Sequence, residues 1–323
     1  MESNIKLEEV QALYFDKDAF KETGIELRRL DNKGQRNYYS LKDNEVEWVY
    51  TSVTTFIKQV LPTSPYLMDY MRDKSKEEQE AILKSSSTYG TLMDMLFCRL
   101  LIDGTITDIY TTVAGFIARE GVVTADVNKW VDSLKKDCLS FCQWVKDYEV
   151  KPLLVSCPLA SKALDIAGTL DLYCEMNSRM ATKTIKPKRV RAIVDFKAKI
   201  GDMSEDHSRG SFYSGECLQL HIYKTLLDHN FPDTDTEAYF NFSPKNWRTA
   251  PTYNLKDWTG SPELTRHQKN FQHYLSVYLN NNEETIERTI LSISDTISLD
   301  DYEQCYRITG LIDTVNERLE GRL

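Results

Sequence analysis

Residues 166–171 read Ile-Ala-Gly-Thr-Leu-Asp, and residues 190–197 read Val-Arg-Ala-Ile-Val-Asp-Phe-Lys. Each is an apolar, β-rich run that reaches an aspartate, which is typical of a buried strand carrying a carboxylate near one end. A helical pattern follows at 216–228, and it places Gln219 and Tyr223 four residues apart on one helix face. The order of strand, strand and helix predicts the centre of an α/β fold.

The polar residues of this stretch suit metal-assisted hydrolysis of a phosphodiester. Mg²⁺ prefers hard oxygen ligands such as carboxylates, water and phosphate, and Asp171 and Asp195 would supply two carboxylates. A bound divalent ion neutralises the phosphate and activates water. Lys197 lies two residues after Asp195, so on an extended strand both side chains point to one face. A lysine there can position or deprotonate water and stabilise developing negative charge.

The short motifs are informative only in combination. Asp/Glu-x-Lys occurs three times in the chain, and only the copy at 195–197 follows a buried strand pattern with a second strand-borne aspartate upstream. Gln-x-x-x-Tyr occurs twice, and only the copy at 219–223 lies in a helical pattern. The signal therefore comes from the order of the motifs along the chain.

This order resembles the RecB-type branch of the PD-(D/E)XK nucleases, in particular phage and mitochondrial single-strand DNA exonucleases and CRISPR-associated relatives. The resemblance covers roughly residues 38–242, including a tyrosine-rich hairpin before a helix that starts near Ser52. It implies a restriction-endonuclease-like fold, in which helices flank a central mixed β-sheet and a large helical insertion forms an arch. It also implies the following roles: metal ligation by Asp171, Asp195 and the Phe196 carbonyl, catalysis by Lys197, and organisation of the site by Gln219 and Tyr223.

One integrated domain with four parts is expected from these patterns. The parts are an N-terminal helix, hairpin and first core helix at 1–62, a helical arch or cap at 63–150, the nuclease core at 151–260, and C-terminal helices at 261–323. A plain packed bundle is the alternative for the second part. Smaller elements expected along the chain are a helix at 5–22, a hairpin of 38–41 with 46–50, a capping box at 75–78, helices at 88–102, 107–119 and 125–148, a strand at 236–242, and helices at 262–280 and 299–319.

The chain departs from the family pattern at one ligand. Members usually carry a metal-binding histidine on an upstream helix in a Gly-Thr-x-x-His frame, whereas Gly90-Thr91-Leu92-Met93 leads here to Asp94. All five histidines follow residue 206, and we expect His221 to be structural. Asp94 is either a replacement ligand, since a carboxylate suits Mg²⁺ or Mn²⁺, or a solvated helix aspartate. No Cys-x-x-Cys pair occurs, so we expect no iron–sulfur cluster.

DNA contacts are expected near the same centre. Ser52 and Thr54 begin a helix whose free amides could hold a phosphate, although simple helix capping explains them too. Lys199 and Arg209 flank a glycine-containing loop and could reach phosphates, or could be ordinary solvated loop residues. The basic segment 177–189 is either a hairpin tip or a phosphate-contacting loop.

Composition limits the other classes of protein. The net charge of −9 argues against a surface built for non-specific DNA binding, but it permits a local basic channel. No apolar run is long enough to span a bilayer, and the seven scattered cysteines indicate reduced thiols. We expect a cytoplasmic protein, in a bacterial cell or a phage-infected host, with no membrane partner.

The predicted function is a Mg²⁺- or Mn²⁺-dependent deoxyribonuclease, an exonuclease acting on single-stranded DNA or duplex ends in replication, recombination or repair. A partner protein from recombination or replication is expected. The alternatives are an endonuclease using the same site and a catalytically impaired nuclease-fold subunit that binds DNA.

Overall fold

The centre of the molecule is an eight-stranded mixed sheet. The computed structural model describes residues 27–294, apart from 33–34, 43–44, 64–67, 70, 107, 123–124, 183–185, 199–211 and 233. The strand order is β1-β2-β3-β5-β6-β7-β8, and β4 pairs with β5 beside this path. The strands are β1 (Leu27–Asn32), β2 (Gln35–Lys42), β3 (Glu45–Ser52), β4 (Lys151–Ser161), β5 (Ile166–Asn177), β6 (Arg189–Phe196), β7 (Ala238–Pro244) and β8 (Tyr253–Asp257).

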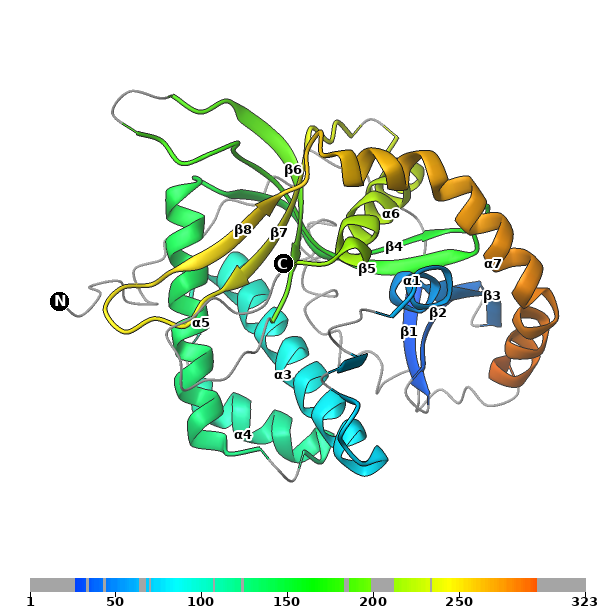
Figure 1. The fold of residues 1–323 in the computed structure, drawn as a ribbon, viewed down its shortest axis with the longest axis horizontal. Coiled ribbons are helices and arrows are strands. Elements are labelled where there is room, and N and C mark those ends of the chain that lie inside the picture. The colour runs from blue at the N-terminus through cyan, green and yellow to red at the C-terminus, as the bar shows by residue number, and fades with distance from the viewer. Residues whose placement is uncertain are drawn as a thin grey trace.

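Helices cover both faces of this sheet. Figure 1 shows α3, α4 and α5 gathered on one side of the strands and α1, α6 and α7 on the other. The helices are α1 (Val53–Val60), α3 (Lys76–Asp103), α4 (Ile109–Glu120), α5 (Val127–Asp147), α6 (Ser214–Asn230) and α7 (Pro262–Ser294). The mixed α/β class expected from the sequence is therefore correct, while the closer likeness to restriction endonucleases stays a prediction.

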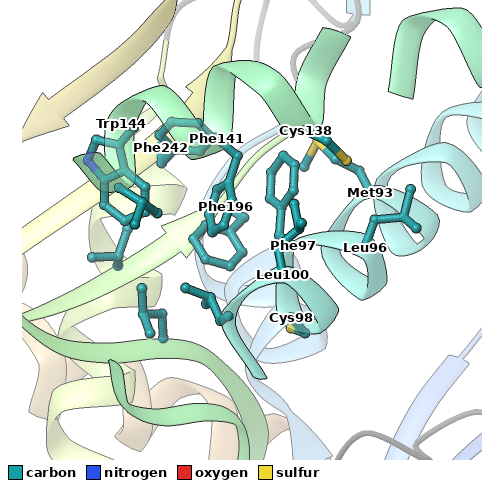
Figure 2. Close-up of a cluster of buried hydrophobic side chains, with 14 of the residues drawn as sticks. Met93, Leu96, Phe97, Cys98, Leu100, Cys138, Phe141, Trp144, Phe196 and Phe242 are labelled. Atoms are coloured by element: carbon teal, nitrogen blue, oxygen red, sulfur yellow. The ribbon is translucent and has the colours of Figure 1, made fainter. Parts of the chain in front are cut away.

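The face under α3 and α5 is filled by aromatic rings, which Figure 2 draws together. Phe97 of α3 stacks on Phe141 of α5, with ring centroids 4.2 Å apart. Phe196 and Phe242 stand edge-on to Phe97 from neighbouring strands, at 5.5 Å and 5.8 Å. We call this cluster of Phe97, Phe141, Trp144, Phe196 and Phe242 the aromatic face. Because α3 and α5 bury their apolar stripes here, they form a layer packed on the sheet.

The opposite face is built from α1, α6 and α7. Its buried residues include Phe56 of α1, Leu220 of α6 and Phe271 of α7, packed against Ile193 of β6. Phe56 and Phe271 meet edge to face with centroids 6.2 Å apart. The side chains of the predicted site project from this second face, so we call it the site face.

Helix α3 differs from the expected pattern. The predicted capping box is present, with Ser75 as N-cap and Glu78 completing it, and the helix ends at Gly104, which has the left-handed conformation. Two helical segments were expected, but one helix runs through all 28 residues from Lys76 to Asp103. The serine-rich segment in its middle continues the helix because Tyr89, Leu92 and Met93 are buried against the rest of the fold. Ser87 and Thr91 donate their hydroxyls to carbonyls of the preceding turn.

The remaining elements follow the sequence with shifted boundaries. The β2–β3 hairpin, the starts of α4, α5 and α6, and strand β7 lie within a few residues of the predicted positions. Strand β8 was not predicted, and α7 extends well beyond residue 280. The helices expected at 5–22 and 299–319 lie outside the described residues. None of the helices described is both long and apolar enough to cross a membrane.

Candidate active site

The candidate site lies in a gap along one edge of β5, between the part that pairs with β3 and the part that pairs with β6. Strand β3 pairs in parallel with β5 only at Ile166 and Ala167. Strand β6 pairs with β5 in antiparallel fashion from Leu172 onward. In the described sheet, residues 168–171 of β5 therefore occupy the opening between β3 and β6, and this segment carries Gly168 and Asp171.

The backbone is irregular at Asp171. Leu170 packs on the site face, whereas Leu172, two residues later, packs on the side of the aromatic face. The regular alternation of side chains along β5 is therefore interrupted at Asp171. Ser156 lies at the corresponding point of the neighbouring strand β4 and has φ 49°, a left-handed value that is uncommon for a residue other than glycine. Such irregularities redirect single side chains and are frequent near active sites. Asp171 uses Oδ2 to accept a hydrogen bond of 2.8 Å from the Phe196 backbone amide, which links β5 to the end of β6.

Asp195 and Lys197 form a close pair on the site face. Asp195 is 1% exposed, and its Oδ2 lies 2.7 Å from Lys197 Nζ. The expectation that both side chains share one face is confirmed by this contact. Lys197 Nζ also donates to Gln219 Oε1 at 3.0 Å, so the lysine joins β6 to α6.

The charge state of Lys197 reflects this setting. Burial by itself lowers the pKa of the ammonium group. Asp195, Asp171 and Glu216 act in the opposite direction and outweigh burial, so the pKa of Lys197 is raised above its usual value. The lysine is therefore a cation held among carboxylates.

The predicted helical pair completes the arrangement. Gln219 Nε2 donates to the Tyr223 hydroxyl at 3.3 Å, which confirms that the two side chains share one face of α6. Burial raises the pKa of Tyr223 well above its usual value, and Asp171, Tyr38 and Asp195 add to the effect. The phenol therefore stays protonated close to both carboxylates.

Gly168 is required by this packing. A Cβ atom at residue 168 would lie 2.8 Å from Val53 Cγ2 and 2.9 Å from Tyr223 Cε1. Real Cβ atoms essentially never approach so closely, and both neighbours are buried side chains. The glycine of the Gly-x-x-Asp motif thus allows α1 and α6 to approach β5 beside Asp171.

Asn241 of β7 belongs to the site although no motif pointed to it. Its Nδ2 donates to Asp195 Oδ2 at 2.7 Å, and its Oδ1 accepts from Trp258 Nε1 at 2.8 Å. In the sequence it is one polar residue in an aromatic strand, Ala-Tyr-Phe-Asn-Phe. That polar residue was the available signal, but its partner could not be known without the register between β6 and β7.

Asp94 lies on α3, which passes close to the end of β6. A Cβ atom at Gly90, one turn before Asp94, would be 3.7 Å from Ala198 Cβ. The pKa of Cys98 is raised well above its usual value by burial first and then by the charges of Asp171 and Asp94, so both carboxylates act on one thiol. Within the part of the chain described, no group of three or more His, Cys, Asp or Glu side chains is placed to hold a metal. Ligation by Asp94 remains a prediction.

The residues proposed to contact DNA fall into two groups. Ser52 is buried and caps α1 by accepting from the Thr55 amide at 3.1 Å, so its capping role is confirmed. Thr54 is exposed at the start of the same helix. Lys199 and Arg209 lie outside the described residues. At the C-terminal end of the basic segment 177–189, Arg189 donates to the Glu149 carbonyl at 2.8 Å and Lys188 pairs with Glu237, so these two cations have partners within the chain.

Comparison with other proteins adds no assignment, because no protein-family model matches the chain and no curated protein matches it significantly.

Proposed function

We propose that this protein is a metal-dependent deoxyribonuclease that hydrolyses phosphodiester bonds from DNA ends. The observation that carries the proposal is the contact chain on the site face. Lys197 bridges the buried carboxylate of Asp195 and the amide of Gln219. Asp171 lies beside them on β5, one residue before Leu172, which pairs with Val194 of β6. A buried carboxylate paired with a partly buried lysine in an opening of a sheet is costly to build, because both charges lose water. Such a cost is typical of sites that perform chemistry.

The donor set fits a divalent cation with hard-ligand preference. Mg²⁺ is commonly held by one or two protein carboxylates together with water and substrate phosphate, so Asp171 and Asp195 are sufficient. The Phe196 carbonyl would add a third oxygen, and Asp94 a fourth. When bound, Mg²⁺ or Mn²⁺ would neutralise the phosphate and lower the pKa of a bound water.

The side chains around the carboxylates have separate roles in this proposal. Lys197 is directed by Asp195 and Gln219, so its ammonium can donate to the scissile phosphate or to the attacking water and stabilise developing charge. Gln219 and Tyr223 hold the lysine and the carboxylates in position, since the two side chains are hydrogen-bonded to each other and lie on a buried helix face. The exposed Thr54 at the start of α1 offers a hydroxyl and helix amides to a neighbouring phosphate.

DNA as the substrate, and action at ends, are supported by the resemblance of the motifs to single-strand exonucleases. The decisive experiment incubates the full-length protein and Mg²⁺ or Mn²⁺ with linear single-stranded, linear duplex and covalently closed circular DNA. We expect the linear forms to be degraded and the closed circles to survive. Asp195→Ala and Lys197→Ala should abolish degradation.

A matched control uses the ion pair between Lys224 and Asp228 on α6. Lys224→Ala removes an ion pair on the same helix without touching the site, and activity should stay at the wild-type level. Cleaved circles would replace the exonuclease proposal with an endonuclease. An inactive wild-type protein that still binds DNA would instead identify a binding subunit.

A further inference from the structure

The amide of Asn241 is placed next to Asp195 by the sheet itself. Strands β6 and β7 are parallel, and their register sets Asp195 opposite Asn241. Paired residues on neighbouring strands project to the same face. Asn241 Nδ2 lies 2.7 Å from Asp195 Oδ2 and 3.5 Å from the Asp195 backbone carbonyl. Asn241 is 0% exposed, so water does not compete for these contacts.

Trp258 decides which end of the amide faces Asp195. The indole Nε1 can only donate a hydrogen bond, and it lies 2.8 Å from the Asn241 Oδ1 atom. The amide oxygen must therefore face Trp258, which leaves the NH₂ group directed at the carboxylate. Trp258 is itself anchored, because it is 4% exposed and its backbone amide donates to the Tyr239 carbonyl at 2.9 Å.

Asp195 Oδ2 thus accepts from two strands at once. Asn241 reaches it from β7, and Lys197 reaches it from the end of its own strand, each at 2.7 Å. Two donors that converge on one oxygen from different directions restrict rotation of the carboxylate about its Cβ–Cγ bond. The position of the second oxygen, Oδ1, is fixed as a consequence.

We propose that Asn241, oriented by Trp258, is a positioning residue that sets the carboxylate of Asp195 for a divalent cation. The inference rests on the proposed metal-dependent nuclease and adds two residues to it. Phe240 and Phe242 flank Asn241 along β7 but point to the opposite face of the sheet, so the Asn241 side chain alone of the three enters the site face. A buried amide needs hydrogen-bond partners for both its oxygen and its NH₂ group. Here Trp258 donates to the Asn241 oxygen, and the Asn241 NH₂ group donates to Asp195.

Outer hydrogen bonds to metal-binding carboxylates typically change metal affinity or activity by roughly ten- to a hundredfold when they are removed. The test therefore measures Mn²⁺ binding to the full chain without DNA, by isothermal titration calorimetry, for the wild-type protein, Asn241→Ala and Trp258→Phe. We expect Asn241→Ala to weaken Mn²⁺ binding by about ten- to a hundredfold. Trp258→Phe keeps the amide but removes its orienting donor, so a smaller loss in the same direction is expected.

The control is Asn177→Ala. Asn177 is similarly buried, at 4% exposed, but lies at the far end of β5 and accepts from Arg189. It should leave Mn²⁺ affinity unchanged even if it lowers stability. Steady-state kinetics give a second measurement: a positioning role lowers kcat and raises the Mn²⁺ concentration needed for half-maximal activity, while KM for DNA stays at the wild-type value.

Thermal unfolding is recorded for every variant. If Asn241→Ala does not fold, Trp258→Phe decides the question. Wild-type Mn²⁺ affinity in a folded Asn241→Ala or Trp258→Phe protein, with an active wild type, would overturn the positioning role and leave the nuclease proposal standing. A wild-type protein that neither binds Mn²⁺ nor cleaves DNA would overturn both.

Discussion

Two faces of the same strands contrast most sharply at the pairs Asp195–Phe196 on β6 and Asn241–Phe242 on β7. Successive residues of a strand point to opposite faces. Phe196 and Phe242 therefore enter the aromatic face with Phe97 and Phe141 (Figure 2), while Asp195 and Asn241 enter the site face. One residue along the chain separates a dry apolar contact from a buried polar network.

This contrast divides stability from chemistry. The aromatic face gains free energy from apolar burial and ring packing. The site face holds Asp195 and Lys197 partly or wholly out of water, and a buried ion pair contributes little to stability even when its geometry is good. Substitutions of the rings of the aromatic face should therefore lower mainly the free energy of unfolding, whereas substitutions of Asp195 or Lys197 should lower mainly activity.

The largest expected effect is on activity, from Asp195→Asn. The variant keeps the shape of the side chain but loses a charge that the proposed reaction needs, so DNA degradation should fall by at least about a thousandfold, or about 4 kcal/mol. Its free energy of unfolding in urea should also fall, by up to about 3 kcal/mol, because the partly buried Lys197 ammonium loses its carboxylate partner, so activity is compared per folded molecule. Undiminished nuclease activity would remove Asp195 from the site.

Phe97→Ala should have the largest effect on stability. It empties the centre of the aromatic face, where the ring stacks on Phe141 at 4.2 Å. Removing a buried phenylalanine costs about 3–5 kcal/mol. Urea unfolding should show this loss, whereas activity per folded molecule should be largely retained. A selective loss of activity without destabilisation would contradict the division between the faces.

A smaller effect on stability is expected from Gly168→Ala, which tests the close packing of α1 and α6 on β5. The new methyl group would press on Val53 and Tyr223, and overpacking of this kind costs about 1–3 kcal/mol. Gly115→Ala on α4 is the control, since a Cβ there meets nothing within 4 Å and alanine favours the helix. Equal unfolding midpoints for the two variants would show that Gly168 is not constrained.

The smallest expected effect is a loss of stability in acid that arises from His221 on the site face. Burial, followed by the charges of Lys224 and His267, lowers the pKa of His221 to about 4, and its ring packs edge-on to Phe271 at 5.1 Å. The unfolded chain then takes up a proton more readily than the folded one, so stability is complete above pH 6.5 and falls as the pH drops toward 4. Urea unfolding at pH 7 and pH 5 should differ by up to about 2 kcal/mol more in the wild type than in His221→Leu. His273→Gln, at an exposed position of α7, should behave like the wild type; the same pH response in His221→Leu would contradict this assignment.

Local pattern was enough to predict several contacts of the candidate site. The two-residue spacing of a strand predicted that Asp195 and Lys197 share a face, and the four-residue spacing of a helix predicted the same for Gln219 and Tyr223; both pairs are in contact. These succeeded because each depends only on the periodicity of one element. The capping box at Ser75 was predicted for the same reason.

Contacts between elements distant in sequence could not be predicted in this way. The contact between Asn241 and Asp195 depends on the parallel register of β6 and β7. The contact between Trp258 and Asn241 depends on β8, a strand that the sequence did not indicate and that Trp258 directly follows. The length of α3 was also missed, because burial of Tyr89, Leu92 and Met93 against the rest of the fold offsets the weak helix propensity of its serines and glycine.

At the opening of the sheet between β3 and β6, the sequence by itself determined which residues are candidates for the proposed chemistry and in what order they follow one another. It did so through side-chain alternation and helical spacing, which are local properties of the chain. Only the tertiary structure decided that β3 and β6 part at Gly168–Asp171 and that Asp195 is held by an amide from β7. Strand order and register arise from packing between segments far apart in the chain, and no single segment contains that information.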